Sequence, residues 1–214
     1  MLPSVFAQQI VVEFTDHTPV SIQENSNLLV NQRLITPGNN ISAYRAQQLA
    51  FAISSLIEEA AQPFGYFSTS CSVKNITTKP QLIYHATCKM NQPVRINSVK
   101  LSISGPGKHT VESKLSTKKM ALQKNQIFQA STYESTKTQL IELVSRLGYV
   151  NASTQSSTLK IDPAKHTADA HIKLETGNLY SFGNTFIDQN VYSKSFLHSM
   201  SPFKTGAAYD DQLL

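Results

Sequence analysis

The chain of 214 residues has no tryptophan, only two cysteines, and a charged fraction of just 15%. It also has no apolar run that approaches the roughly 18 residues of a transmembrane helix. Apolar residues supply 40% of the sequence, which is enough to build a core. The length suits one large domain or two small ones. The composition is therefore that of an ordinary globular protein.

The motifs by which many enzymes and metal proteins are recognised are missing as well. There is no Gly-x-Ser-x-Gly elbow, and the glycines of residues 104–110 lack the spacing of a phosphate-binding loop. His166 and His171 lie five positions apart without a third metal ligand nearby. Glu58 and Glu59 are adjacent on a predicted helix and point in different directions. We therefore expect a protein that is not an enzyme and that needs no metal or other cofactor.

Positive charge is present but unevenly distributed along the chain. The formal net charge is +5, although the first 88 residues hold four basic and five acidic side chains. The rest of the chain holds the other fifteen basic and nine acidic side chains. Between residues 89 and 124, eight basic side chains accompany one acid, Glu112. The excess positive charge thus belongs to the later part of the sequence.

Part of this basic segment falls on a predicted helix. Three of its lysines could contact anionic lipid headgroups or an acidic partner: Lys114, Lys118 and Lys119. A solvated helix face would give the same pattern. No aromatic residues interleave with these lysines, so we do not expect the chain to bind nucleic acid.

The first residues show part of an export signal. Val5 and Ala7 occupy positions −3 and −1 of a plausible signal-peptidase site before Gln8, but the charged and long apolar regions of a signal peptide are absent. One hypothesis is that residues 1–7 are the remnant of a removed signal. A frayed terminus is the alternative.

The two cysteines fall on a predicted hairpin. Residues 82–90 alternate between apolar and polar positions, as a half-buried strand does, and residues 71–76 form a plausible partner strand. A hairpin centred between positions 79 and 80 places Cys71 opposite Cys88, within disulfide reach. We predict a Cys71–Cys88 disulfide, which indicates an oxidising compartment. Two buried free thiols are the alternative.

The order strand, helix, helix, strand, strand occurs twice in the sequence. The first copy begins with an alternating strand at residues 9–14, shows little pattern between residues 15 and 40, and has a clear helix that ends at Pro63 and Gly65. The apolar stripe of this helix contains Leu49, Ile53, Leu56, Ile57 and Ala60. The cysteine hairpin completes the copy.

The second copy begins with the strand at residues 95–105 and a basic helix around His109 to Leu122. A second helix follows and is capped by Gly148, 83 positions after Gly65. Its expected buried stripe contains Leu140, Ile141, Val144 and Leu147. A hairpin of residues 153–161 and 167–174 closes the copy, and it presents Ala168, Ala170, Ile172 and Leu174 to the core.

A third copy begins near the end of the sequence. A strand is expected at residues 178–187, followed by a short helix near Tyr192 and Phe196. Tyr209 would then be the counterpart of Tyr44 and Tyr133. Asp210 and Asp211 have the composition of a first helical turn, so the sequence stops where a helix would begin.

Several short motifs resemble those of a known family. The triplets Gly65–Phe67 and Gly148–Val150 follow the second helix of each copy. The third copy has Gly177, Tyr180, Phe182 and Gly183, and later Phe203, Lys204, Gly206 and Tyr209. Together they resemble POTRA domains, the periplasmic repeats that precede the β-barrel in the outer-membrane protein assembly family, and most of all those of its TamA branch.

The resemblance implies an α+β fold of tandem POTRA domains, each with the order β-α-α-β-β and two helices packed on a three-stranded mixed sheet. The third strand of each domain would be central. The implied division is a first domain at residues 8–92, a second at 93–176, and the N-terminal half of a truncated third at 177–214.

The resemblance also implies a function. The chain would be the periplasmic part of an outer-membrane-anchored protein of a Gram-negative bacterium, with its C-terminal β-barrel outside this sequence. It would bind unfolded outer-membrane proteins such as autotransporters, and a TamB-like partner anchored in the inner membrane. A two-partner secretion transporter, a BamA-like protein, and an envelope or division adaptor are the alternatives.

In this fold the second strand of each domain is left at an edge of the sheet. In the second copy this strand, residues 151–161, carries Lys160 as its only charge, although exposed edges usually carry charge or proline. Such an edge could add an extended strand of a client protein. A polar edge that merely keeps the protein in solution is the alternative. The candidate binding residues are Asn151, Ser153, Gln155, Ser157 and Leu159.

Overall fold

A computed structural model describes residues 10–34, 42–77, 81–117, 120–186, 188–189, 191–202 and 204–210. The signal remnant predicted at residues 1–7 therefore lies outside the described residues. The chain forms two compact units. The first takes in residues up to Ile96 together with 125–130 and 161–168, and the second takes in the remainder.

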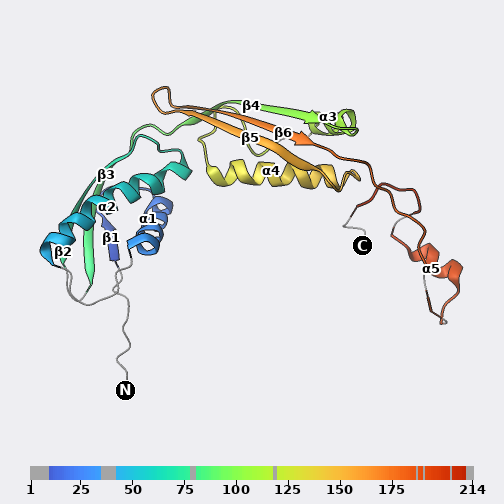
Figure 1. The fold of residues 1–214 in the computed structure, drawn as a ribbon, viewed down its shortest axis with the longest axis horizontal. Coiled ribbons are helices and arrows are strands. Elements are labelled where there is room, and N and C mark those ends of the chain that lie inside the picture. Colours follow the sequence, from blue (N-terminus) through green and yellow to red (C-terminus); the bar gives the residue numbers. More distant parts are fainter. Residues whose placement is uncertain are drawn as a thin grey trace, which may run out of the picture. The chain divides into compact units, whose positions relative to one another are not determined.

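The first unit contains a mixed sheet of three strands (Figure 1). Strand β3 (Leu82–Lys89) is central, between β1 (Ile10–Phe14) and β2 (Ser70–Thr77). Strand β1 runs parallel to β3, and β2 runs antiparallel to it. Both β1 and β2 are thus edge strands, as the resemblance implies.

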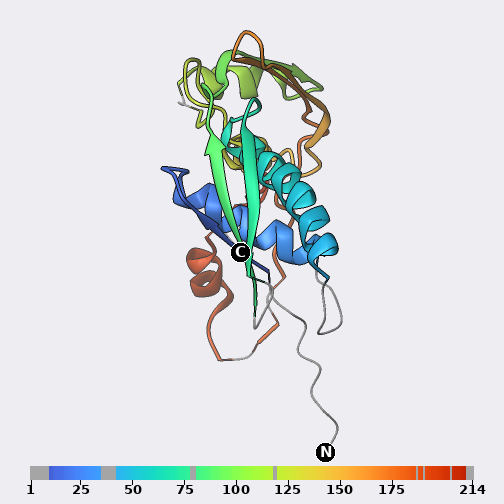
Figure 2. The same ribbon diagram turned by 90° about the vertical axis from the view of Figure 1, so that its left-hand side faces the viewer.

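Two helices pack on one face of this sheet, α1 (Val20–Leu34) and α2 (Ala43–Ala61), as Figures 1 and 2 show. The short 3₁₀ helix η1 (Gln62–Phe64) ends at Gly65, which has a φ of 92°. Burying the apolar face of each element against the sheet provides the main stabilisation of the unit. The core contains Ile10, Val12, Val30, Ile53, Leu56, Ile57, Leu82, Tyr84 and Ala86.

Helix α1 was not evident from the sequence pattern of residues 15–40. Only Ile22, Ser26 and Val30 are buried on it, at intervals of four, so its apolar stripe is narrow and includes a serine. The Ser26 hydroxyl donates to the Ile22 carbonyl oxygen at 2.6 Å, which satisfies the buried polar atom. Sequence periodicity therefore understated this helix.

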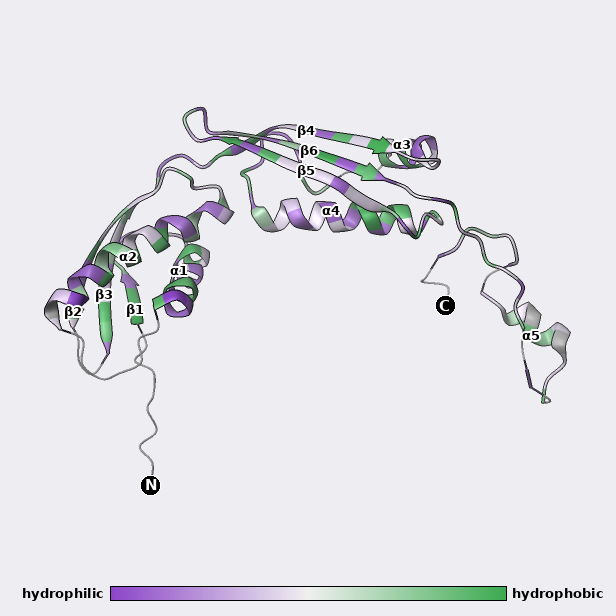
Figure 3. Ribbon diagram, viewed as in Figure 1, coloured by the Kyte–Doolittle hydropathy of each residue, from purple (hydrophilic) through white to green (hydrophobic). Residues whose placement is uncertain are grey.

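The second unit has the same layout. Strand β6 (Thr167–Glu175) is central, between β4 (Arg95–Ser104) and β5 (Ser153–Asp162). Helix α4 (Ala130–Ser145) lies along one face of the sheet, and α3 (Lys108–Ser116) follows β4 (Figure 1). Hydrophobic and hydrophilic residues alternate along the strands (Figure 3). The predicted inward residues of β6 are buried: Ala168, Ala170, Ile172 and Leu174.

Both helices of the second unit differ in detail from the prediction. Helix α3 ends at Ser116 rather than near Leu122, because the Thr117 amide bonds the Leu115 carbonyl instead of continuing the helical ladder. On α4, Leu140 and Val144 are buried as predicted, but Ile141 is only half-buried, and so is Leu147, which lies just after the helix. Tyr133 and Thr136 complete the buried stripe instead.

A pattern of backbone hydrogen bonds occurs once in each unit. In the first, the Val94 amide donates to the Gly65 carbonyl at 2.8 Å, and the Phe128 amide donates to the Val94 carbonyl at 2.9 Å. In the second, the Tyr180 amide donates to the Gly148 carbonyl at 2.7 Å, and the Tyr209 amide donates to the Tyr180 carbonyl at 3.0 Å. Gly148, with a φ of 91°, matches Gly65 in conformation too.

This pattern corrects two predictions about the third copy. These bonds make Tyr209 the counterpart of Phe128 rather than of Tyr133. The prediction differed because it matched the tyrosines by side-chain type alone. No strand forms in the described part of residues 178–187, where a single bridge joins Ser181 to Ala208. The short helix is present as α5 (Lys194–Met200), and Tyr192 precedes it. Phe203 and Asp211 lie outside the described residues.

The two units confirm the predicted α+β class, with the order β-α-α-β-β and helices packed on three-stranded mixed sheets. Among the described helices, none is both long enough and apolar enough to cross a membrane.

Candidate functional site

The edge strand β2 is joined covalently to the centre of its sheet. Cys71 lies opposite Cys88 in the predicted register, and a disulfide links them. Their Cα atoms are 4.1 Å apart, as in a cross-strand pair that exchanges no backbone hydrogen bonds with each other. The amide and carbonyl of Cys71 therefore point outward, away from β3.

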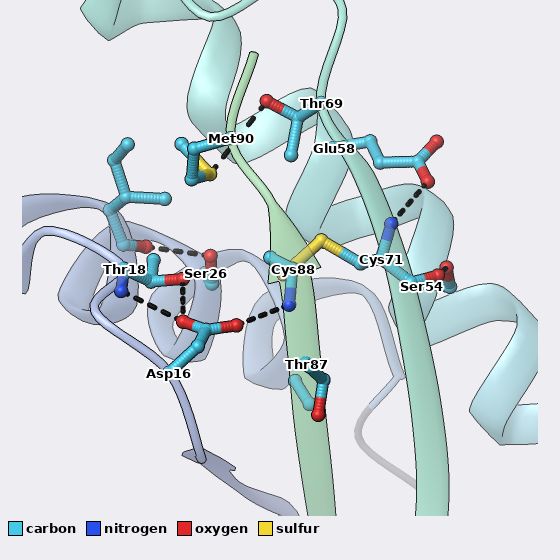
Figure 4. Close-up of a disulfide and its surroundings, with 12 residues drawn as sticks. Asp16, Thr18, Ser26, Ser54, Glu58, Thr69, Cys71, Thr87, Cys88 and Met90 are labelled. Atoms are coloured by element: carbon cyan, nitrogen blue, oxygen red, sulfur yellow. Dashed lines mark hydrogen bonds between the residues drawn. A yellow bond between two sulfur atoms is a disulfide. The ribbon is translucent and has the colours of Figure 1, made fainter.

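Side chains from α2 occupy these outward groups of Cys71 (Figure 4). The Cys71 amide donates to Glu58 Oε1 at 3.1 Å, and the Ser54 hydroxyl donates to the Cys71 carbonyl at 2.6 Å. At this position the helix takes the place of a further strand, so the edge is closed at Cys71.

The edge is open two and four residues further along. Orientation alternates along an antiparallel strand, so the backbone groups of Val73 and Asn75 point outward as those of Cys71 do. Within the described part of the chain, no backbone or side-chain group bonds to these outward amides and carbonyls. Two residues thus offer two amide donors and two carbonyl acceptors to an extended segment.

A groove of ≈ 1030 Å³ runs beside this open edge, between α2 and β2. Phe51 of α2, a residue that is 80% exposed, lines it, and Ala50 and Val73 add further apolar surface. An incoming strand could therefore bond to β2 and place every second side chain against α2. The other lining residues are Gln47, Ser54, Cys71, Ser72, Lys74, Asn75, Ile76 and Thr77.

Sequence reasoning did not identify this groove. One signal was available: Phe51 lies outside the apolar stripe of its helix, so a large aromatic side chain was left without a place in the core. The contacts from Glu58 and Ser54 could not have been predicted, because they depend on how the helix sits against the strand.

The residues proposed from sequence lie on the corresponding edge of the second unit. Ser153, Gln155 and Ser157 are exposed on β5, and Leu159 is half-buried there. Asn151 precedes the strand, and its side-chain Nδ2 donates to the Tyr180 hydroxyl at 2.8 Å. Four of the five residues therefore share one edge strand, whereas Asn151 is engaged within the unit. Client binding at this edge stays a prediction.

The structure describes one of the three lysines proposed for anionic contacts. Lys114 is exposed near the end of α3. Lys118 and Lys119 lie outside the described residues. A lipid-binding role for these lysines also stays a prediction. Among the described residues, no three His, Cys, Asp or Glu side chains gather as metal ligands would.

Asp16 forms a hydrogen bond to the central strand β3 at Cys88 (Figure 4). Its carboxylate accepts hydrogen bonds from the Cys88 amide and from the Thr18 amide and hydroxyl. Burial by itself would raise the pKa of Asp16, but these hydrogen bonds lower it by more, so the pKa lies below the ordinary value of 3.8. The ionised carboxylate therefore stabilises the folded first unit.

We expect Asp16→Asn to lower the free energy of unfolding of the first unit by about 1 kcal/mol at neutral pH, since solvent partly screens the lost charge-assisted bonds. The pKa of Asp16 is lower in the folded than in the unfolded state, so its stabilisation is fully present above the unfolded pKa and is lost as the pH falls through the folded pKa. The difference between the variant and the parent should therefore shrink below about pH 4. Urea denaturation at several pH values measures it, with the exposed Glu24→Gln as control. A difference that does not change with pH would contradict the assignment.

Part of the chain matches a known family model. Residues 94–177 match the family model described as "POTRA: Surface antigen variable number repeat". The chain is similar to the crystal structure of Haemophilus influenzae BamA POTRA3-5, with 19% identity over 97% of this chain and 81% of that chain, at a TM-score of 0.46.

Two further solved structures are similar. POTRA1-2 of the periplasmic domain of Omp85 from Anabaena is 15% identical over 82% of this chain and 98% of that chain, at a TM-score of 0.32. CdiB from Escherichia coli is 12% identical over 78% of this chain and 27% of that chain, at a TM-score of 0.32. The match to the family model covers residues 94–177, which is less than half of the chain.

Proposed function

We propose that this chain is the periplasmic POTRA region of an outer-membrane assembly or secretion factor, and that it binds extended segments of client or partner proteins. The observation that carries the proposal is the open edge of β2 at Val73 and Asn75, next to the groove along α2. An edge of this kind needs only backbone groups from its ligand. It therefore suits a protein that receives many unfolded sequences rather than one.

The groove would add a preference without strict sequence demand. Its helix side presents Phe51 and Ala50, whereas the other face of β2 exposes Ser70, Ser72 and Lys74 and, at its end, the apolar Ile76. A segment in which apolar and polar residues alternate would match both sides. Strands of outer-membrane barrels have this alternation, with apolar side chains on the lipid side. Such strands are the client class that we propose.

We further propose the division into POTRA domains at residues 8–92 and 93–176, with the first half of a third at 177–214. The hydrogen bonds around Gly65 and Gly148 support it, because each glycine carbonyl accepts the amide that begins the next copy. A TamA-like factor with a TamB-like partner is our specific assignment, with autotransporters among the clients. A two-partner secretion transporter is the second candidate.

Site-specific photocrosslinking in cells, in the full-length protein, tests client binding. A photoreactive amino acid at each position of β2 should crosslink to outer-membrane precursors, with yields that recur at every second residue. The matched control is Thr87, which lies opposite Ser72 but on the central strand, one strand further from the edge. Equal yields at Ser72 and Thr87, or silence along β2 and β5 in an exported and folded protein, would contradict strand addition.

A further inference from the structure

The other edge of the first sheet, strand β1, is covered by two asparagine side chains of α1. The Val12 amide donates to Asn27 Oδ1 at 2.9 Å, and Asn27 Nδ2 donates to the Val12 carbonyl at 3.0 Å. The Ile10 amide donates to Asn31 Oδ1 at 3.1 Å, and Asn31 Nδ2 donates to the Ile10 carbonyl at 2.8 Å. Each carboxamide thus pairs with both outward backbone groups of one strand residue.

This arrangement reproduces the bonds of a neighbouring strand. A carboxamide has the same donor and acceptor as a peptide group. Four residues of a helix rise about 6 Å, and two residues of a strand rise about 6.6 Å, so side chains at i and i+4 reach alternate strand residues. Asn27 and Asn31 therefore meet Val12 and Ile10 in register.

The two carboxamides are also fixed in place. The second hydrogen of Asn27 Nδ2 is directed to the Gln23 carbonyl at 3.2 Å, and Asn31 Nδ2 also donates to the Asn27 carbonyl at 2.8 Å. Phe14, the third outward residue of β1, is the last residue of the strand and could offer a single pair of bonds. An added strand would find no run of free backbone groups along β1.

We propose that Asn27 and Asn31 close β1 to strand addition, so that this sheet accepts an extended, alternating apolar and polar segment only along β2, opposite Val73 and Asn75. The closure of β1 stands on the bonds described above, whereas binding at β2 rests on the proposed function. Glu58 and Ser54 limit the register at the other end, because they already occupy the outward groups of Cys71. The incoming strand can therefore add to this sheet at β2 only, and its register is limited at the Cys71 end.

The experiment uses the whole chain with a benzophenone amino acid at Lys74 on β2 or at Glu13 on β1, both exposed. The probe is a capped ten-residue peptide in which valine and phenylalanine alternate with threonine. We expect crosslinking from position 74 to exceed that from position 13 by about tenfold or more, since four backbone bonds are available only at β2. In the Asn27→Ala, Asn31→Ala variant, crosslinking from position 13 should approach that from position 74.

Asn25→Ala is the matched control. Asn25 lies on the same helix, but its side-chain Nδ2 donates to the Ala60 carbonyl of α2 at 2.9 Å rather than to β1. Crosslinking from position 13 should stay low in this variant. Strong crosslinking from position 13 in the unmodified chain, or an equal rise in the control and in the double variant, would overturn the closure.

Hydrogen exchange separates the two parts of the inference and does not depend on the variants folding. In the unmodified chain, the Ile10 and Val12 amides should exchange at least about tenfold more slowly than those of Val73 and Asn75. Equal rates would overturn the closure of β1. Slow exchange at Ile10 and Val12 without peptide crosslinking at either edge would support the closure and overturn strand addition at β2, and with it the proposed function.

Discussion

Replacing Gly148 by alanine is expected to lower the free energy of unfolding of the second unit by about 2–5 kcal/mol. The φ of 91° costs an L-residue about 1–2 kcal/mol. A Cβ atom would also lie 2.9 Å from the Tyr180 carbonyl oxygen and 2.7 Å from Leu179 Cδ1, and such overpacking costs about 1–3 kcal/mol more. The Gly148 carbonyl would lose the geometry in which it accepts the Tyr180 amide.

Two other glycines of the second unit separate these effects. Gly206 has a φ of 84° but nothing within 4 Å of its Cβ position, so Gly206→Ala should cost only the conformational part, about 1 kcal/mol. Gly183 has neither constraint, and its alanine variant should stay within about 0.5 kcal/mol of the parent. Urea denaturation followed by far-UV circular dichroism measures all three. Exchange of the Tyr180 amide shows whether the segment after Gly177 detaches. Equal effects of the Gly148 and Gly206 variants would contradict the steric argument.

Removal of the disulfide by Cys71→Ala and Cys88→Ala together is expected to destabilise the first unit by about 3 kcal/mol. The bond closes a loop between residues 17 positions apart, and constraint of the unfolded chain by a loop of this size is worth about that much. The unit has no other covalent link, because the chain has only these two cysteines. The loss should appear in exchange of the β2 and β3 amides.

The second unit provides an internal control for this variant. It contains no cysteine, so exchange of the Ala170 and Ile172 amides on β6 should be unchanged. Addition of a reductant to the parent chain should reproduce the change in the first unit. A double variant as stable as the parent would contradict the predicted contribution of the disulfide.

Hydrophobic periodicity predicted most strands and helices of this chain. The alternation in residues 82–90 and 167–174 is strict because β3 and β6 are paired on both sides and buried on one face. Helix α1 was missed for a physical reason. Its residues Asn27 and Asn31 contribute hydrogen bonds to β1 where an apolar residue would normally contribute packing, so no apolar period records the contact.

The candidate site was predicted less completely than the fold. The position of Cys71 opposite Cys88 follows from the symmetry of a hairpin, and the structure pairs them so. The edge strands were expected from the resemblance to POTRA domains. What the sequence could not reveal is which edge groups are already occupied, because Glu58 and Ser54 reach Cys71 from another element. Occupancy of this kind depends on tertiary packing.

The disulfide has a mechanical consequence for an edge that holds a client. Tension along an added strand would load β2 in shear, and the hydrogen bonds between β2 and β3 would share that load. Since Cys71 is bonded to Cys88, part of the tension passes through a covalent link into the central strand. Under the proposed strand addition, a pull on the added strand would reach β3 through this link instead of peeling β2 away from the sheet.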